Sequence, residues 1–234
     1  MSEMNQPAER TIILHYHLFK NAGTSVDEIL KHNFGDKWIT REFPSTGESN
    51  TELVEEWIRD TPEAIAYSSH TMLGPLPVIE GVKIISFMLL RDPIERIISA
   101  YKHEATESLI TPAVLLAKSF SFQEYVAVRF QNPGDRQCRN FHVYRLGSLC
   151  IHPGATELEL AKLGLTKLSI VGRVESFMEA INKLKAAVVN VFPRFHVFNH
   201  ATNLSKFRTE IKPPLDFIAY LTDINRQDFE LLDY

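Results

Sequence analysis

The sequence is poor in cysteine, and its only two thiols belong to Cys138 and Cys150. Two cysteines do not make a disulfide framework or a zinc site, so we expect both thiols to be reduced. Long hydrophobic runs are also missing, since no window approaches the roughly 18 apolar residues of a membrane span. Residues 1–10 are polar and lack the apolar region of a signal peptide. These absences predict a cytoplasmic protein without a membrane span.

The sequence also lacks a large excess of either charge, because it contains 25 Lys and Arg residues and 29 Asp and Glu residues. A general nucleic-acid binder is usually strongly basic, so we expect no nucleic-acid partner, although a local basic groove is compatible with this balance. An apolar content of 44% over 234 residues suffices for one substantial core. We therefore expect a single domain over residues 11–234 after a flexible tail at residues 1–10. Nothing in the pattern indicates the oligomeric state.

Apolar runs alternate with helical patterns along the chain. We expect strands at residues 11–18, 38–43, 64–68, 82–90 and 168–171. We expect helices at residues 24–34, 50–59, 93–107, 119–130, 155–163 and 175–192, and two more within 213–234. The run at 82–90 is almost continuously hydrophobic, as in a central parallel strand buried on both faces. The alternation predicts right-handed βαβ units and a three-layer α/β/α fold with a central, mainly parallel sheet.

The first informative stretch is the loop at residues 20–25, which we call the anion loop. It follows an apolar strand and carries Lys20 and Gly23, and the hydroxyls of Thr24 and Ser25 then open a helix. A helix start offers unpaired N–H groups and a partial positive charge, to which the hydroxyls and the lysine add further donors. Gly23 allows a tight turn close to a bound oxygen. The loop therefore predicts a phosphate or sulfate site.

The anion loop is not a Walker A motif. That motif has its lysine directly after the second glycine, whereas Lys20 precedes the only glycine by three residues. A P-loop kinase or ATPase is therefore a weak match. The alternative for the loop is an ordinary helix start, capped by Thr24, in which Lys20 is solvated and Asp27 in the first turn favours the helix dipole.

The second informative stretch is Arg91-Asp92-Pro93 and the helix that follows it. Arg91 stands at the end of the 82–90 strand, where open α/β sheets bind their ligands. Ser99 lies three residues after Arg96, so the two share a helix face. Arg91 and Ser99 can therefore converge on one anion, with a bidentate contact from the guanidinium. The alternative is an exposed ion pair between Asp92 and Arg96, with Ser99 only packed.

These two stretches resemble the nucleotide-binding motifs of sulfotransferases that use 3′-phosphoadenosine-5′-phosphosulfate (PAPS). The anion loop is similar to their Pro-Lys-Thr-Ala-Gly-Thr-Ser loop, with Phe19 in place of Pro and Asn21 in place of Thr. Residues 91–101 are similar to their Arg-Asp-Pro-x-x-Arg-x-x-Ser-x-Tyr element. The closest subgroup contains the uronyl 2-O-sulfotransferases and their bacterial relatives, whose Gly-His pair is matched by Ser69-His70. Residues 171–175 and 228–231 resemble further elements of the subgroup.

The resemblance implies a role for each matching residue. It implies that the 5′-phosphosulfate is bound by Lys20, Asn21, Ala22, Gly23, Thr24 and Ser25. It implies that Arg91 and Ser99 bind the 3′-phosphate, and that Lys20 neutralises charge on the bridging oxygen. His70 is implied as the general base, whereas His103 and His142 are weaker candidates. His17 either lines the site or positions the loop. The co-substrate would be PAPS, the product adenosine 3′,5′-bisphosphate, and no metal would be needed.

The acceptor implied by this resemblance is a hydroxyl on a carbohydrate or glycoconjugate. The irregular stretch expected at residues 131–147 mixes cations with aromatics, and it either lines an acceptor groove or is a solvated loop. Lys206 and Arg208 lie in a late loop that can reach the nucleotide. Two rival functions remain, a nucleotide-dependent kinase with an atypical phosphate loop and a non-catalytic nucleotide-binding protein of the same fold.

Overall fold

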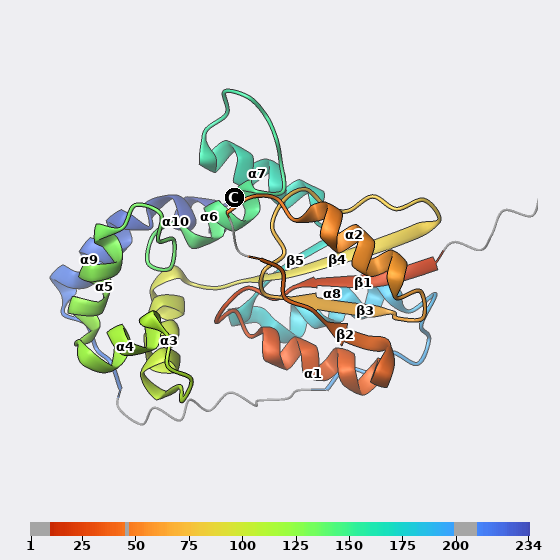
Figure 1. The fold of residues 1–234 in the computed structure, drawn as a ribbon, viewed down its shortest axis with the longest axis horizontal. Coiled ribbons are helices and arrows are strands. Elements are labelled where there is room, and N and C mark those ends of the chain that lie inside the picture. Colours follow the sequence, from red (N-terminus) through yellow and green to blue (C-terminus); the bar gives the residue numbers. More distant parts are fainter. Residues whose placement is uncertain (1–9, 45–46, 199–209) are drawn as a thin grey trace, which may run out of the picture.

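The computed structural model describes residues 10–44, 47–198 and 210–234, and these contain one five-stranded sheet (Figure 1). The strands are β1 (Arg10–Tyr16), β2 (Trp38–Thr40), β3 (Ala66–Ser69), β4 (Val82–Leu90) and β5 (Ile170–Arg173). All neighbouring pairs are parallel, in the order β2-β3-β1-β4-β5. The expected α/β fold with a parallel sheet is therefore confirmed. Lys206, Arg208 and residues 1–9 of the expected tail lie outside the described residues, whereas Arg10 begins β1.

Helices cover both faces of this sheet. One face packs against α1 (Gly23–Phe34) and α8 (Phe177–Val188), through a core that includes Ile13, Phe87 and Leu89. The other face packs against α2 (Thr51–Asp60), α6 (Phe141–Gly147), α7 (Glu157–Lys167) and α10 (Arg226–Leu232). Successive side chains of a strand point to opposite faces, and both faces are apolar here. This explains the nearly continuous hydrophobic run in β4.

The remaining helices form a lobe beside the sheet, with a core of its own (Figure 1). The lobe consists of α3 (Pro93–Thr106), α4 (Pro112–Ser119), α5 (Phe122–Gln131) and α9 (Leu215–Ile224). Tyr101 packs edge-on against Phe122 and Tyr125, with ring centroids 5.5 Å and 5.1 Å away. The expected helix at 119–130 begins only at Phe122, because Ser121 and Glu124 form a capping box there. The separate helix α4 was not expected from the sequence.

The expected irregular stretch at residues 131–147 is wrong over its last part, which is helix α6. No side chain next to this helix caps its start, where Asn140 is left-handed. The carboxylate of Asp228 in α10 accepts hydrogen bonds from the backbone N–H groups of His142 at 3.2 Å and Val143 at 2.8 Å. The cap thus comes from Asp228, which lies 85 residues after Val143. The sequence around the start of α6 therefore could not predict this cap.

The carboxyl ends of the strands bring the informative stretches together, as expected for an open parallel sheet. β1 leads into the anion loop, β3 into His70 and β4 into Arg91. Two short 3-10 helices, η1 (Gly35–Lys37) and η2 (Val174–Ser176), precede β2 and follow β5. The expected second strand ends at Thr40 instead of residue 43, and Phe43 N–H donates to the Thr71 hydroxyl at 2.6 Å.

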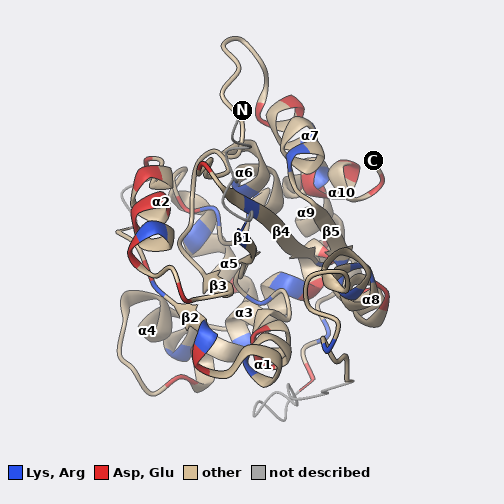
Figure 2. Cartoon of the chain, turned by 90° about the vertical axis from the view of Figure 1, so that its right-hand side faces the viewer, with Lys and Arg blue, Asp and Glu red and all other residues tan. Residues whose placement is uncertain are grey.

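The charges are distributed unevenly over the fold. Acidic residues mark the outer helices α2 and α7 in Figure 2, whereas several basic segments lie nearer the middle of the view. A net charge of -4 is therefore compatible with a local basic site. Within the described part of the chain, none of the helices is long and apolar enough to cross a membrane.

Candidate active site

The anion loop has an unusual backbone. Lys20 and Ala22 adopt positive φ angles of 63° and 58°, although neither is glycine. Such left-handed conformations cost roughly 1–2 kcal/mol for a residue with a β-carbon. Alternation between left- and right-handed residues turns successive N–H groups toward one side, which makes an anion-binding concavity. The strained pair thus lies where the sequence predicts an anion.

The loop leads directly into α1. Ala22 occupies the N-cap position and Gly23 is the first helical residue, so the capping by Thr24 that was considered as an alternative is wrong. Ala22 has no polar side chain, so the N-cap residue itself makes no side-chain hydrogen bond to this helix start. The N–H groups of Gly23 and Thr24 have no partner within the helix and add to the concavity. The Thr24 side chain is exposed, whereas Ser25 is buried.

Asn21 fixes the loop from inside the protein. Its side-chain Nδ2 donates to the Leu89 carbonyl of β4 at 2.7 Å and lies 2.9 Å from Nε2 of His142 in α6. Because Nε2 accepts from Asn21, the proton of His142 is on Nδ1, which lies 3.3 Å from the Asp228 carboxylate. Asn21, His142 and Asp228 are almost completely buried. A direct contact between Asn21 and the donor therefore stays a prediction, and its visible role is to hold the loop.

Gly23 is required by a neighbouring side chain rather than by its own backbone angles. A β-carbon at this position would lie 2.0 Å from Cδ2 and 2.3 Å from Nε2 of His17. Gly23 does not have a positive φ, and its expected close approach to a bound oxygen stays a prediction. The missing side chain makes room for the His17 ring, which covers the start of α1.

The two predicted nucleotide motifs meet at Lys20 and Arg91. Arg91 Nη1 donates to the Lys20 carbonyl at 3.2 Å. Burial, together with the nearby Arg91, holds the pKa of Lys20 below its ordinary value. The described residues include no ion-pair partner for Lys20, and Arg91 has only Glu95, at 3.7 Å and 62% exposed. The site therefore carries positive charge that a bound anion would neutralise.

Ser99 lies half-buried on α3, one turn before His103. The His103 ring contacts Phe19 edge-on, with centroids 5.6 Å apart. Burial, followed by the charge of Lys20, lowers the pKa of His103. Positions 99 and 103 share a helix face, so the Ser99 face of α3 is the face toward the anion loop.

Arg96 does not form the exposed ion pair with Asp92 that was considered as an alternative. Its side chain is 1% exposed, lies over the Phe141 ring at 4.2 Å, and donates to the Gln137 carbonyl. Asp92 instead caps α3 by accepting from Glu95 N–H at 2.9 Å. The Asp92 N–H in turn donates to Glu175 at 2.8 Å, which ties the second motif to the segment after β5.

His70 lies at the end of β3 with 47% of its side chain exposed. Its Nδ1 is 2.7 Å from Oε1 of Glu42, so in the neutral imidazole the proton is on Nδ1 and Nε2 is the acceptor. Burial alone would raise the pKa of Glu42, but hydrogen bonds from His70 and Thr71 hold it below its ordinary value. The sequence did not predict Glu42, because it lies in an irregular segment 28 residues before His70.

Two more histidines share one carboxylate beside this pair. His15 Nδ1 lies 2.9 Å from Oδ1 of Asp27, and His17 Nδ1 lies 2.8 Å from Oδ2. Asp27 therefore does more than interact with the helix dipole. Burial alone would raise its pKa, but the hydrogen bonds from the two histidines hold that pKa below its ordinary value. The three side chains are also close enough to suggest a metal site. However, the rings of His15 and His17 are stacked at 23°, so their Nδ1 atoms point at separate oxygens rather than at one ion.

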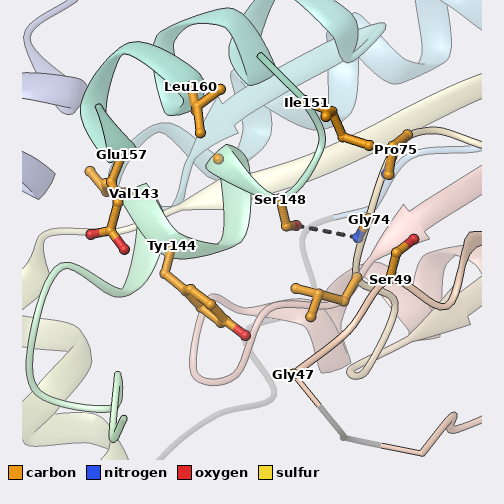
Figure 3. Close-up of a pocket in the computed structure, with 12 residues that line it drawn as sticks. Gly47, Ser49, Gly74, Pro75, Val143, Tyr144, Ser148, Ile151, Glu157 and Leu160 are labelled. Carbon is orange, nitrogen blue, oxygen red and sulfur yellow. Dashed lines mark hydrogen bonds between the residues drawn. The ribbon is translucent and has the colours of Figure 1, made fainter. Parts of the chain in front are cut away.

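A pocket of about 310 Å³ lies between α6, the start of α7 and two loops (Figure 3). Its polar lining comes from Ser49, Tyr144, Ser148 and Glu157. Leu73 and Gly74 form the part of the wall that continues from His70. Arg145 supports that segment, because its Nη2 donates to the His70 and Met72 carbonyls at 3.0 Å and 2.8 Å.

The cationic and aromatic residues at 136–145 do not all have the same role. Tyr144 lines the pocket, and Arg136 lies over its ring while it pairs with Glu157 at 2.5 Å. Arg139 donates to the Phe130 carbonyl at 2.7 Å, and neither residue lines the pocket. His142 is fully buried behind the anion loop. Only part of the stretch lines a cavity, and the rest supports the fold.

Comparison with known proteins agrees with this arrangement. A relative from Archaeoglobus fulgidus, described as an uncharacterized protein, is 35% identical over 242 residues, covering 95% of this chain and 94% of the relative. A family model described as "Sulfotransferase family" matches residues 8–234. Sulfotransferases of this family generally use PAPS as the sulfate donor and a hydroxyl group as the acceptor. Because the match runs through all five strands and both informative stretches, the chain belongs to the sulfotransferase family.

Proposed function

We propose that this protein transfers the sulfuryl group of PAPS to a hydroxyl acceptor. The observation that carries the proposal is the contact between the two motifs, in which Arg91 donates to the Lys20 carbonyl at 3.2 Å. This contact sets two cations side by side, and neither has a buried carboxylate partner among the described residues. A ligand with two separate phosphate groups matches such a site better than a ligand with one.

The donor would bind across both motifs. The left-handed residues of the anion loop and the start of α1 supply N–H groups for the 5′-phosphosulfate. Thr24 and Ser25 add hydroxyls, and Lys20 lies where charge develops on the bridging oxygen. Arg91 and Ser99 would bind the 3′-phosphate, because Arg91 contacts the loop and Ser99 shares a helix face with His103, which contacts Phe19. The chemistry of this donor set fits PAPS.

The transfer is an in-line displacement at sulfur. The acceptor oxygen forms a bond to sulfur as the bond from sulfur to the 5′-phosphate oxygen breaks. His70 Nε2 takes the acceptor's proton, and adenosine 3′,5′-bisphosphate leaves with the electron pair of the broken bond. Glu42 holds the imidazole with its proton on Nδ1, so the free lone pair lies on the exposed edge. Lys20 stabilises the leaving group as its negative charge grows.

The acceptor that we propose is a carbohydrate or glycoconjugate, as in the uronyl 2-O-sulfotransferase subgroup. The pocket beside the His70 segment supports this proposal, because it combines the Tyr144 ring with the hydroxyls of Ser49 and Ser148. Sugars bind well where an aromatic face lies among hydrogen-bonding groups. Tyr144→Ala is expected to raise the KM for a sugar acceptor and to leave the KM for PAPS unchanged.

A transfer assay with radiolabelled PAPS tests the function. The purified protein is incubated with a panel of sugars, lipids and simple alcohols, in the presence of a metal chelator. We expect labelled product from at least one sugar, without added metal. Transfer from ATP that requires magnesium would identify a kinase instead. Tight binding of adenosine 3′,5′-bisphosphate without any transfer from PAPS would favour a non-catalytic nucleotide-binding protein.

A further inference from the structure

Three imidazoles form a column at the carboxyl ends of β1 and β3. His15 stacks on His17 with ring centroids 5.3 Å apart, and His17 contacts His70 with centroids 3.8 Å apart. Each Nδ1 faces a carboxylate, which is Asp27 for the first two rings and Glu42 for His70. The column runs from the buried side of the sheet to the exposed His70, and the proposed transfer step uses only its last member.

His17 is the member that touches both halves of the site. Its backbone N–H donates to the carbonyl of Ser69, the residue before His70, at 3.0 Å. The edge of its ring, Cδ2 and Nε2, lies against Gly23 at the start of α1. The ring is held in this place by the Asp27 carboxylate, which belongs to α1 itself. One imidazole therefore joins the anion loop, the first turns of α1 and the His70 segment.

We propose that His17, held by Asp27, is a positioning residue of the transfer site that sets His70 against the start of α1. The inference rests on the proposed function, since it concerns the base of that reaction. His17 is 7% exposed, so an acceptor cannot reach it as it reaches His70, which is half-exposed. Four neighbouring groups, Asp27, His15, His70 and Glu42, surround the ring. Burial lowers the pKa of His17 more than these carboxylates raise it, so the ring is neutral near pH 7.

Two substitutions separate the parts of this arrangement. Asp27→Asn keeps the shape, but the amide cannot accept from both Nδ1–H groups, so one of the two histidines must change its tautomer. His17→Asn removes the ring that lies between Gly23 and His70. His32→Asn is the matched control, because His32 is an exposed histidine near the other end of α1.

Imidazole nitrogen NMR of the wild type is the first readout, and it does not depend on any transfer. We expect the proton on Nδ1 of His17 and of His70, and a nuclear Overhauser contact between the two rings. In His17→Asn, the His70 ring should take more than one orientation, seen as broadened or doubled imidazole signals, while Glu42 still holds its Nδ1. A wild type without the ring contact, or an unchanged His70 signal in this variant, would overturn the proposal even if the protein transfers sulfate.

Kinetics with PAPS and a sugar acceptor from the panel are the second readout. Misplacement of a reacting group by about 1 Å costs about 100-fold in rate. Both variants should therefore lose about 10- to 100-fold in kcat, and the acidic limb of the pH–rate profile should shift. Their affinity for adenosine 3′,5′-bisphosphate should stay within about twofold of the wild-type value. If the variants lose thermal stability but keep the wild-type kcat and pH profile, His17 is only a packing residue and the proposal is wrong. If the wild type transfers nothing, the proposed function fails, and the NMR readout still decides whether His17 positions His70.

Discussion

Lys20 and Ala22 hold backbone angles that residues with a β-carbon avoid, and they lie beside Arg91, whose ion-pair partner Glu95 is largely exposed. Strain of this kind persists only where the surrounding structure imposes it. Here the Asn21 amide is fixed to β4, and Arg91 donates to the Lys20 carbonyl. The loop is therefore organised before any ligand binds, so that binding an anion requires little rearrangement.

Lys20→Ala tests the charge at the transferred group. We expect kcat to fall by about 100-fold or more, because a cation that meets developing charge acts mainly in the transition state. The affinity for adenosine 3′,5′-bisphosphate should fall by less than about tenfold, as measured by calorimetry. Lys31→Ala, on the last turn of α1, serves as the control. Unchanged turnover in Lys20→Ala would contradict the proposed role.

Gly23→Ala tests the close approach of His17. A β-carbon 2.0 Å from the His17 ring must displace it, so thermal stability and nucleotide affinity should both decrease. The same change in a His17→Ala background should cost much less, because the ring is gone. A double-mutant cycle by thermal unfolding measures this coupling. Equal costs in both backgrounds would show that His17 is not the reason for the glycine.

At the scale of elements, α6 connects the two sides of the site. His142 on this helix contacts Asn21 of the anion loop, and Arg145 donates to the His70 and Met72 carbonyls. The helix has only residues 141–147 and no local cap, so its position depends on the Asp228 carboxylate of α10. The C-terminal helix therefore acts on the site through α6.

Asp228→Asn tests this dependence. An amide in place of the carboxylate leaves one N–H group of α6 without an acceptor and places a donor opposite it, which should destabilise the protein by about 1–3 kcal/mol. Nucleotide affinity should fall as well, because His142 no longer holds Asn21 firmly. Asp233→Asn, which changes an exposed carboxylate next to the last residue, Tyr234, is the control. Chemical denaturation and calorimetry give the two values, and wild-type stability in Asp228→Asn would contradict the assignment.

The elements that the sequence predicted well are those with local signals. The run at 82–90 shows its burial on both faces directly, and Pro93 marks the start of α3. The start of α6 could not be predicted, because its cap lies in α10. Glu42 was missed for a similar reason, since only the fold brings it to His70. Arg96 was misjudged because its partner, the Gln137 carbonyl, belongs to the backbone of a distant segment.

At the scale of the whole molecule, the site lies where the sheet meets the helical lobe (Figure 1). β4 leads through Arg91 directly into α3, the first helix of the lobe. The nucleotide would therefore touch both cores, with the anion loop on the sheet side and Ser99 on the lobe side. Nucleotide binding is expected to stabilise the two parts together, through ordinary linkage.

The buried histidine gives the molecule a defined response to acid. Burial lowers the pKa of His17 from its ordinary 6.5, so the unfolded chain binds a proton there at a higher pH than the folded protein does. The contribution of His17 to stability is therefore complete above about pH 6.5 and is lost as the pH falls toward the lower folded value. Melting temperatures from about pH 7.5 to about pH 5.5 should decline less steeply in His17→Phe than in the wild type. Parallel curves would contradict this assignment.

Titration calorimetry with adenosine 3′,5′-bisphosphate tests the two-motif site most directly. The wild type is compared with the Arg91→Ala/Ser99→Ala double variant and with Ser99→Ala alone, and adenosine 5′-phosphate serves as the ligand without the 3′-phosphate. The account predicts that the double variant loses about 100-fold in affinity for the bisphosphate, since bonds to charged groups contribute about 1.5–3 kcal/mol each. Affinity for adenosine 5′-phosphate should fall much less, because Arg91 acts on the anion loop only through the Lys20 carbonyl. Wild-type affinity for the bisphosphate in the double variant, or an equal loss for both ligands, would contradict it.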